Sequence, residues 1–151
     1  MNDTDASNGF SPQERASMKA RSAELKAEAK RAKDSEKAAA DAQDVLSKIE
    51  GMPDGDRELA LRLHAIVADV APGLSPKLYY GQPGYVRDGK VVVFFRSGQQ
   101  DKVRYSTFGV SPEAQLDDES GLWATSYALI DPTEAAWSRL AEIVRRAAGA
   151  A

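Results

Sequence analysis

An Asp-Gly pair between two strand-like segments constrains the fold of this chain more than any other feature. It lies in the stretch LYYGQPGYVRDGKVVVFF (78–95), where Asp88-Gly89 separates Val86-Arg87 from Lys90-Val91. A two-residue hairpin turn needs positive φ at both central positions, and Asp and Gly are among the residues that tolerate it. The stretch therefore predicts a strand, a tight turn and a second strand.

The two strands of this hairpin differ in character. After the turn, apolar residues fill both alternating faces, Val91, Val93 and Phe95 on one and Val92 and Phe94 (with Arg96) on the other. That pattern predicts a central strand at least partly covered on both sides. The strand before the turn contains Pro83, which cannot donate to a ladder and belongs at an edge, a bulge or a bend.

Three helices are expected before this hairpin. Ser11, Pro12 and Glu14 have the spacing of a capping box, which predicts a helix from there to about Lys33. A second helix is expected from near Asp41 or Asp44, and a third begins at Asp54 or Asp56 and stops at Pro72-Gly73.

After the hairpin, the stretch SGQQD (97–101) predicts a turn, followed by strands at about 102–108 and 122–130. Asp131-Pro132-Thr133-Glu134 then opens a C-terminal helix. The order of elements predicts an α+β fold, with an antiparallel meander of four or more strands packed by helices. We divide the chain into a disordered stretch (1–10), a charged helical extension (11–40) and an α+β domain (41–149).

The helical extension is rich in bases, and a basic arm for nucleic acid is one interpretation. Acids are interleaved with those bases, and mixed-sign runs are usually solvated faces, so we favour an exposed charged helix. The chain as a whole carries a formal charge of −3 with a pI near 5.2. Nucleic-acid binding is therefore not expected. The bases are Lys26, Lys30, Arg31, Lys33 and Lys37, and the acids are Glu24, Glu28, Asp34 and Glu36.

Composition excludes several classes of site. The chain has no cysteine and a single histidine, which rules out disulfides, thiolate metal sites and cysteine-ligated iron–sulfur clusters. His64 flanks the apolar side of the third helix, where a satisfied boundary residue is a better interpretation than a ligand. The N-terminus MNDTDASNGF has no signal-peptide character and no apolar run could span a bilayer, so we expect no membrane and a cytoplasmic location.

Several motifs together resemble the YdhG-like family of small bacterial domains, over roughly residues 42–148. The motifs are ALRLHAIV (60–67), APGLSPKLYYGQPGY (71–85), DGKVVVFF (88–95), KVRYSTFGVS (102–111), LDD (116–118) and LWATSYAL (122–129). The resemblance implies a frataxin-like layout and, for some members, iron binding and delivery to an iron-accepting protein. It carries no catalytic residue set.

If iron is bound, its ligands must be hard oxygens, because thiolates are absent and imidazole is nearly so. The acids at the start of the third helix have an ordinary explanation as caps. Asp117, Asp118 and Glu119 lie on a loop without such a duty, and they are the candidate ligands. Neighbouring residues of an extended loop point opposite ways, however, so at most two of them could share an ion.

The second candidate is a small-molecule or protein interaction site on the aromatic side of the sheet. Apolar walls with a few convergent polar groups are the general form of a ligand site. The alternative is that the arginines stack on exposed aromatics at the sheet edge and the tyrosines are ordinary sheet residues. The candidate residues are Tyr79, Tyr80, Tyr85, Arg96, Arg104 and Trp123, with Tyr105 as a further aromatic wall.

No enzyme motif is present in the sequence. It has no Gly-rich phosphate loop and no nucleophile elbow, and a Ser-His-Asp arrangement would have to use His64, which has no obvious serine partner. We therefore expect a non-catalytic protein. Iron binding is its first expected role, without haem or an iron–sulfur cluster, and an interaction module on the aromatic face is the alternative.

Overall fold

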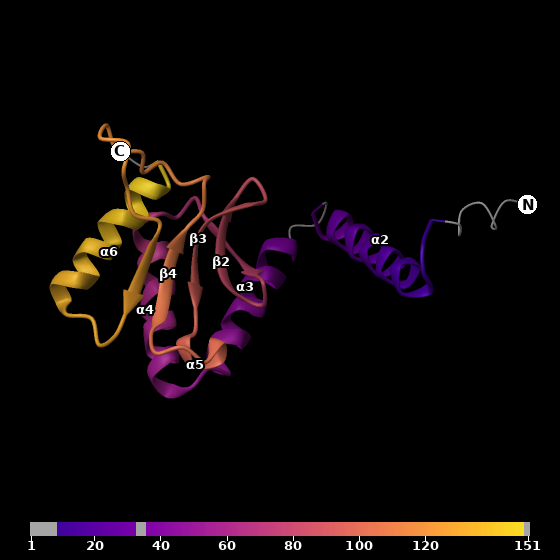
Figure 1. The fold of residues 1–151 in the computed structure, drawn as a ribbon, viewed down its shortest axis with the longest axis horizontal. Coiled ribbons are helices and arrows are strands. Elements are labelled where there is room, and N and C mark those ends of the chain that lie inside the picture. The colour runs from indigo at the N-terminus through magenta and orange to yellow at the C-terminus, as the bar shows by residue number, and fades with distance from the viewer. Residues whose placement is uncertain (1–8, 33–35, 150–151) are drawn as a thin grey trace, which may run out of the picture. The chain divides into compact units, whose positions relative to one another are not determined.

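The structure is a computed structural model that describes residues 9–32 and 36–149 (Figure 1). The chain forms two units that divide between Ala39 and Ala40. The predicted α+β domain with an N-terminal helix is confirmed. Most of the stretch expected to be disordered (residues 1–8) lies outside the described residues, and so does part of the expected extension (33–35).

The first unit contains α2 (Pro12–Ala32), and its predicted capping box is confirmed. Ser11 N donates to Glu14 Oε1 at 2.8 Å, and Glu14 N donates to Ser11 Oγ at 3.0 Å. Each side chain thus satisfies one backbone N–H that the helix cannot. No residue of α2 whose burial is described is buried. The stability of this helix therefore comes from the helix propensity of its residues and from its cap.

The helix α3 spans the boundary between the units, and the second unit continues with another helix, a sheet interrupted by a short helix, and a last helix. α3 begins at Glu36, earlier than the expected Asp41 or Asp44, because the intervening alanines and lysine are good helix formers. The elements are α3 (Glu36–Glu50), α4 (Asp54–Val70), β1 (Ser75–Tyr79), β2 (Gln82–Arg87), β3 (Lys90–Arg96), α5 (Gly98–Asp101), β4 (Ser106–Val110), β5 (Ser126–Leu129) and α6 (Glu134–Ala147).

The five strands pair antiparallel in chain order, β1-β2-β3-β4-β5, so β3 is the central strand as predicted. The Asp88-Gly89 turn is confirmed, with φ of 52° and 78°. A second tight turn was not expected. Tyr80-Gly81 closes a hairpin between β1 and β2, where only a kink around Pro83 had been predicted.

The Pro83 prediction was only partly right, since β2 pairs on both sides and is not an edge strand. Pairing of β2 with β3 begins at Gly84, just after the proline. The bulge lies further along, because Tyr85 pairs with Val93 whereas Val86 pairs with Val91. Val92 is the extra residue, and both Val92 and Val93 are buried, which corrects the strict alternation predicted for this strand.

The later elements also differ from the prediction. The expected turn at 97–101 contains the helix α5, which Ser97 caps by accepting a hydrogen bond from Gln100 N. β4 begins at Ser106 rather than near 102, and β5 covers only Ser126–Leu129 of the expected 122–130. Thr133 caps α6 by accepting from Ala136 N.

One face of the sheet carries the core. In Figure 1, α3 and α4 lie behind the sheet, and no helix of this unit lies in front of β2, β3 and β4. We call this front side the open face. The largest fully buried core side chains come from both layers, the sheet and the helices: Tyr85, Phe95, Phe108, Ile49, Leu63, Val45, Val67, Val93 and Val144.

His64 is a satisfied boundary residue, as predicted. Its Nδ1 lies 3.0 Å from the buried hydroxyl of Tyr85. Burial lowers the pKa of His64 and raises the pKa of Tyr85. The imidazole is therefore neutral and the phenol protonated, and the two groups share one hydrogen bond.

This half-buried histidine should make stability depend on pH. Its pKa is lowered in the folded state, so below about pH 6.5 the unfolded chain takes up a proton that the folded chain resists. We expect the free energy of unfolding to fall as the pH drops from 7.5 to 5.5 in urea titrations. His64 is the only histidine, so His64→Gln should flatten the slope, and an unchanged slope would contradict the assignment.

Candidate functional site

On the open face, the ring of Tyr79 contacts two other aromatic side chains, those of Tyr80 and Phe94. The ring centroids of Tyr79 and Phe94 lie 5.2 Å apart, and those of Tyr79 and Tyr80 lie 4.7 Å apart in an edge arrangement. We call these three residues the aromatic cluster. They come from the end of β1, the following turn and the centre of β3, so two tight hairpins bring them together.

Tyr80 is the unusual member of this cluster. Its side chain is 82% exposed, and its backbone is left-handed with φ of 47°. Left-handed backbone costs an ordinary residue about 1–2 kcal/mol and suits Gly or Asn far better than an aromatic residue. The chain thus presents a large ring to solvent at a position that disfavours it.

Arg96 holds the turn in place. Its guanidinium forms two hydrogen bonds to the Asp101 carboxylate, each 3.0 Å long, and donates a third to the Tyr80 carbonyl at 3.3 Å. These bonds from Arg96 hold the pKa of Asp101 below its usual value. Arg96 is therefore committed to positioning the Tyr80-Gly81 turn rather than to a ligand.

Glycine makes room for the cluster. A Cβ on Gly109 would lie 2.3 Å from the Phe94 ring, so the ring lies across the backbone of β4. A Cβ on Gly84 would lie 2.8 Å from the Tyr79 Cβ. The small residues let both rings pack down onto the sheet, which leaves little freedom to rearrange.

A shallow groove of about 410 Å³ runs beside Tyr79. Its apolar lining includes Leu78 of β1, Val91 and Pro112. Three charged residues also line it: Lys77, Lys90 and Glu113. The groove and the aromatic cluster share Tyr79, so together they form one continuous surface. It offers an apolar centre with a charged border.

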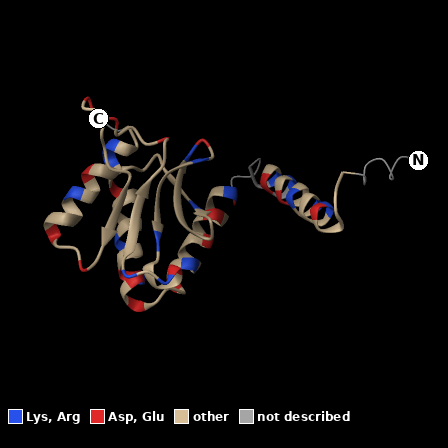
Figure 2. Cartoon of the chain, in the orientation of Figure 1, with Lys and Arg blue, Asp and Glu red and all other residues tan. Residues whose placement is uncertain are grey.

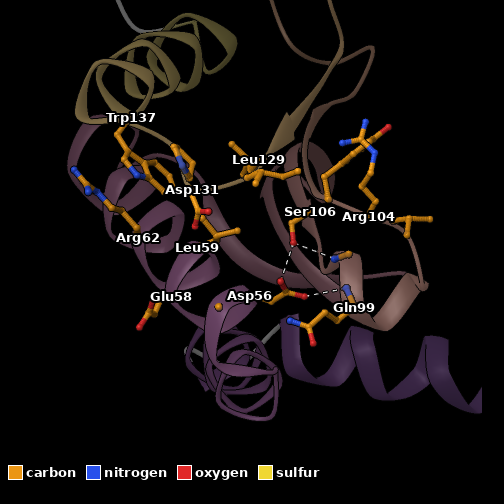
Figure 3. A pocket seen from close by; sticks show the side chains of 16 residues that line it. Asp56, Glu58, Leu59, Arg62, Gln99, Arg104, Ser106, Leu129, Asp131 and Trp137 are labelled. Carbon is orange, nitrogen blue, oxygen red and sulfur yellow. Dashed lines mark hydrogen bonds between the residues drawn. The ribbon is translucent and has the colours of Figure 1, made fainter.

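A separate cleft of about 430 Å³ lies between the start of α4, the α5–β4 segment and the β5–α6 loop (Figure 3). Asp56 lies at its base and is only 7% exposed. Its carboxylate accepts hydrogen bonds from the Ser97 hydroxyl, from Gln99 N at 3.0 Å and from the Ser106 hydroxyl at 3.2 Å. Burial alone would raise the pKa of Asp56, but these donors outweigh it and lower the pKa.

Two arginines line the sides of this cleft. Arg62 forms a bidentate pair with Glu134, and its guanidinium lies 4.9 Å from the centre of the Trp137 ring. Arg104 lies on the other side, 5.3 Å from the Tyr105 ring (Figure 3). Arg62 and Asp56 each form hydrogen bonds to residues of distant elements. These contacts therefore hold the elements around the cleft together.

The structure divides the predicted ligand-binding residues among four places. Tyr79, Tyr80 and Arg96 meet at the open face as expected. Tyr85 is in the core, only 1% exposed, which corrects its assignment to the aromatic surface. Arg104 lines the cleft, and Trp123 lines a different hollow together with Leu116 and Asp117. These six residues therefore do not line one common pocket.

The three predicted metal ligands lie on the exposed loop before β5. Asp118 accepts hydrogen bonds from the backbone N and hydroxyl of Ser120, at 3.0 and 2.5 Å, and the hydroxyl bond lowers its pKa. Asp117 lines the hollow beside Trp123, whereas Asp118 and Glu119 do not line that hollow. Over the part of the chain that the structure describes, no three Asp, Glu or His side chains are arranged to hold a metal ion.

Sequence reasoning missed two residues that matter here. Phe94 was assigned only to the sheet, although it anchors the aromatic cluster. The sequence predicts Asp54 or Asp56 as the helix cap, yet Pro53 stands at the cap position and makes no side-chain cap bond. The sequence gives a partial indication of another role for one of these acids, because Asp54 and Asp56 cannot both serve as the cap.

A scan against protein-family models, a search of curated proteins and a search of solved structures each find no match for this chain. Among the described residues, no helix is both long and apolar enough to cross a membrane.

Proposed function

We propose that this chain is a non-catalytic protein-interaction module whose partner docks on the aromatic cluster and the groove beside it. The observation that carries the proposal is Tyr80, a ring held 82% exposed on a left-handed backbone. Strained, exposed aromatic positions persist where function favours them, and tyrosine is enriched at the energetic centres of protein interfaces.

The surrounding geometry supports a protein partner over a small molecule. The cluster lies on the front of the sheet rather than inside an enclosed cavity, and small ligands usually have most of their surface buried. A partner segment could cover Tyr80 and place an apolar side chain in the groove that Tyr79 and Val91 line. Lys77, Lys90 and Glu113 would then form a polar rim.

Preorganisation strengthens this proposal. Tyr79 and Phe94 lie on strands, and Arg96 braces the turn that carries Tyr80. Side chains fixed before binding lose little conformational entropy when a partner arrives. Iron delivery, which the resemblance to the YdhG-like family implies, stays a prediction, because no described group of ligands supports it.

Tyr80→Asn separates function from stability. The substitution creates an Asn-Gly turn, the preferred sequence for this hairpin type, so we expect the free energy of unfolding to rise by about 0.5 kcal/mol. Partner binding should be lost. The measurement pairs a urea titration with quantitative affinity capture from cells of the source organism, in which proteins retained by the wild type are compared with those retained by the variant.

Leu122→Asn is the matched control, because Leu122 is 81% exposed and lies on the β4–β5 connection away from the cluster. Partners that depend on the open face should disappear with Tyr80→Asn and remain with Leu122→Asn. An identical set of captured proteins for both variants and the wild type would contradict the proposal.

A further inference from the structure

Several basic side chains of α2 lie on a different side of the helix from its acidic ones. At about 3.6 residues per turn, Arg15, Lys19, Lys26 and Lys30 fall within roughly 60° of one another around the helix axis. We call these four residues the basic stripe. The acids of α2 (Glu14, Glu24 and Glu28) fall on the remaining circumference, so the interleaved sequence folds into a helix with one wholly basic side.

Two of the three acids of α2, Glu14 and Glu28, have local partners, whereas the bases of the stripe lack acidic ones. Glu14 caps the helix with Ser11, and Glu28 lies 4.0 Å from Arg21 on the other side. Within the described residues, Arg15 contacts only the Phe10 carbonyl at 3.0 Å, and no acid pairs with Lys19, Lys26 or Lys30. The four bases of the stripe are all solvent-exposed. They lie on a helix along which basic and acidic residues alternate in sequence (Figure 2).

The spacing of these bases works against the helix itself. Arg15 with Lys19, and Lys26 with Lys30, are like charges four residues apart, and each such pair costs an isolated helix about 0.2–0.5 kcal/mol. A helix arranged for its own stability would place a glutamate four residues before each lysine. An anionic partner along the stripe would relieve this repulsion.

We propose that the basic stripe of α2 binds the phosphate backbone of a nucleic-acid duplex. The stripe extends over about 22 Å at 1.5 Å per residue. Its neighbours on the helix surface are small (Ala16, Ser22, Ala23 and Ala29), which lets phosphates approach. An α-helix fits the major groove of B-DNA, which is about 12 Å wide.

Two other kinds of partner, a membrane surface and a protein, fit the stripe less well. A membrane-surface helix needs an apolar face to bury, and α2 offers only Met18 and Leu25 among its exposed residues. A protein interface needs apolar or aromatic anchors at its centre, and the stripe has none. Phosphate contacts, in contrast, are made mainly by Lys and Arg and need no apolar centre.

The test is fluorescence anisotropy of the full chain with a labelled mixed-sequence DNA duplex of 20 base pairs, over a range of salt concentrations. If four bases contact phosphates, the logarithm of the association constant should fall against the logarithm of salt with a slope of about −3 to −4. Lys19→Gln/Lys26→Gln/Lys30→Gln should weaken binding roughly tenfold or more at 50 mM salt and reduce the slope to about −1.

The matched control removes the same charge elsewhere, through Lys48→Gln/Lys102→Gln/Arg139→Gln in the second unit, and it should bind as the wild type does. Gln and Lys have similar helix propensities, so circular dichroism should show equal helicity for both variants. Equal losses in the two variants, no DNA binding at 50 mM salt, or tighter binding to anionic vesicles or polyglutamate than to DNA would each overturn the proposal.

Discussion

Replacing Asp56 by alanine should lower the free energy of unfolding by about 3 kcal/mol, because each buried donor left without a partner costs about 1–3 kcal/mol. Asp56 joins the first turn of α4 to the α5–β4 segment, more than forty residues further along the chain, by accepting from Ser97, Gln99 and Ser106. Ser97 and Ser106 are buried, so their hydroxyls could not form replacement hydrogen bonds to water. Urea titration at pH 7 measures the loss.

Asp54→Ala is the control for this variant. Asp54 occupies the same first turn and has the same relation to the helix dipole, but its side chain is 89% exposed and pairs only with Arg57. An exposed pair of this kind contributes about 0.2–1 kcal/mol. A similar cost for both substitutions would show that Asp56 acts only through the helix dipole.

The acid side of the pH profile gives an independent check on Asp56. Its pKa is lowered in the folded state, so its carboxylate stabilises the fold above the ordinary aspartate pKa of about 3.9. That contribution is lost as the pH falls through the folded pKa. The difference between the wild type and Asp56→Ala should therefore shrink below about pH 4, a window well separated from that of His64.

Gly98→Ala should have a comparable effect for a different reason. A Cβ at this position would lie 2.4 Å from Tyr105 O and 2.5 Å from Tyr105 C, and neither backbone atom can swing aside as a side chain would. Overpacking usually costs about 1–3 kcal/mol, and we expect the upper end of that range. The change should also move the segment that bonds to Asp56, because Gly98 N donates to Ser106 Oγ.

Gly55→Ala is the matched glycine substitution. Gly55 lies in the first turn of α4, and a Cβ there would meet no atom within 4 Å. Alanine is the better helix former, so this variant should gain about 0.5–1 kcal/mol. Thermal melts of the two variants should therefore shift in opposite directions. A loss of stability in Gly55→Ala, or none in Gly98→Ala, would contradict this account of the two sites.

Features set by adjacent residues were predictable from sequence. Asp88-Gly89, the Ser11–Glu14 capping box and the start of α6 at Thr133 each depend on a few neighbouring residues and on backbone preferences that belong to those residue types. The α+β class followed from the order of these local signals. Each is an interaction that the chain makes with itself over a short distance.

Features decided by tertiary contacts were not predictable. Nothing in a Tyr-Tyr-Gly sequence indicates a left-handed tyrosine, because the Arg96 contact to the turn comes from β3. The Val92 bulge likewise depends on the pairing of two strands. The proposed binding site was half predicted: the tyrosines were named from composition, but which of them faced solvent depended on hairpin register, and so Tyr85 was misplaced.

The strand order also has a consequence for folding kinetics. Every strand pairs with the one before it, and the first two pairings close through turns of two residues. Low sequence separation between contacting residues favours rapid folding, so β1, β2 and β3 are natural candidates for the folding nucleus. The aromatic cluster is complete once Phe94 has joined this nucleus, whereas the core still awaits Trp137, Leu140 and Val144 of α6. We therefore expect the aromatic cluster to form before α6 packs its buried side chains into the core.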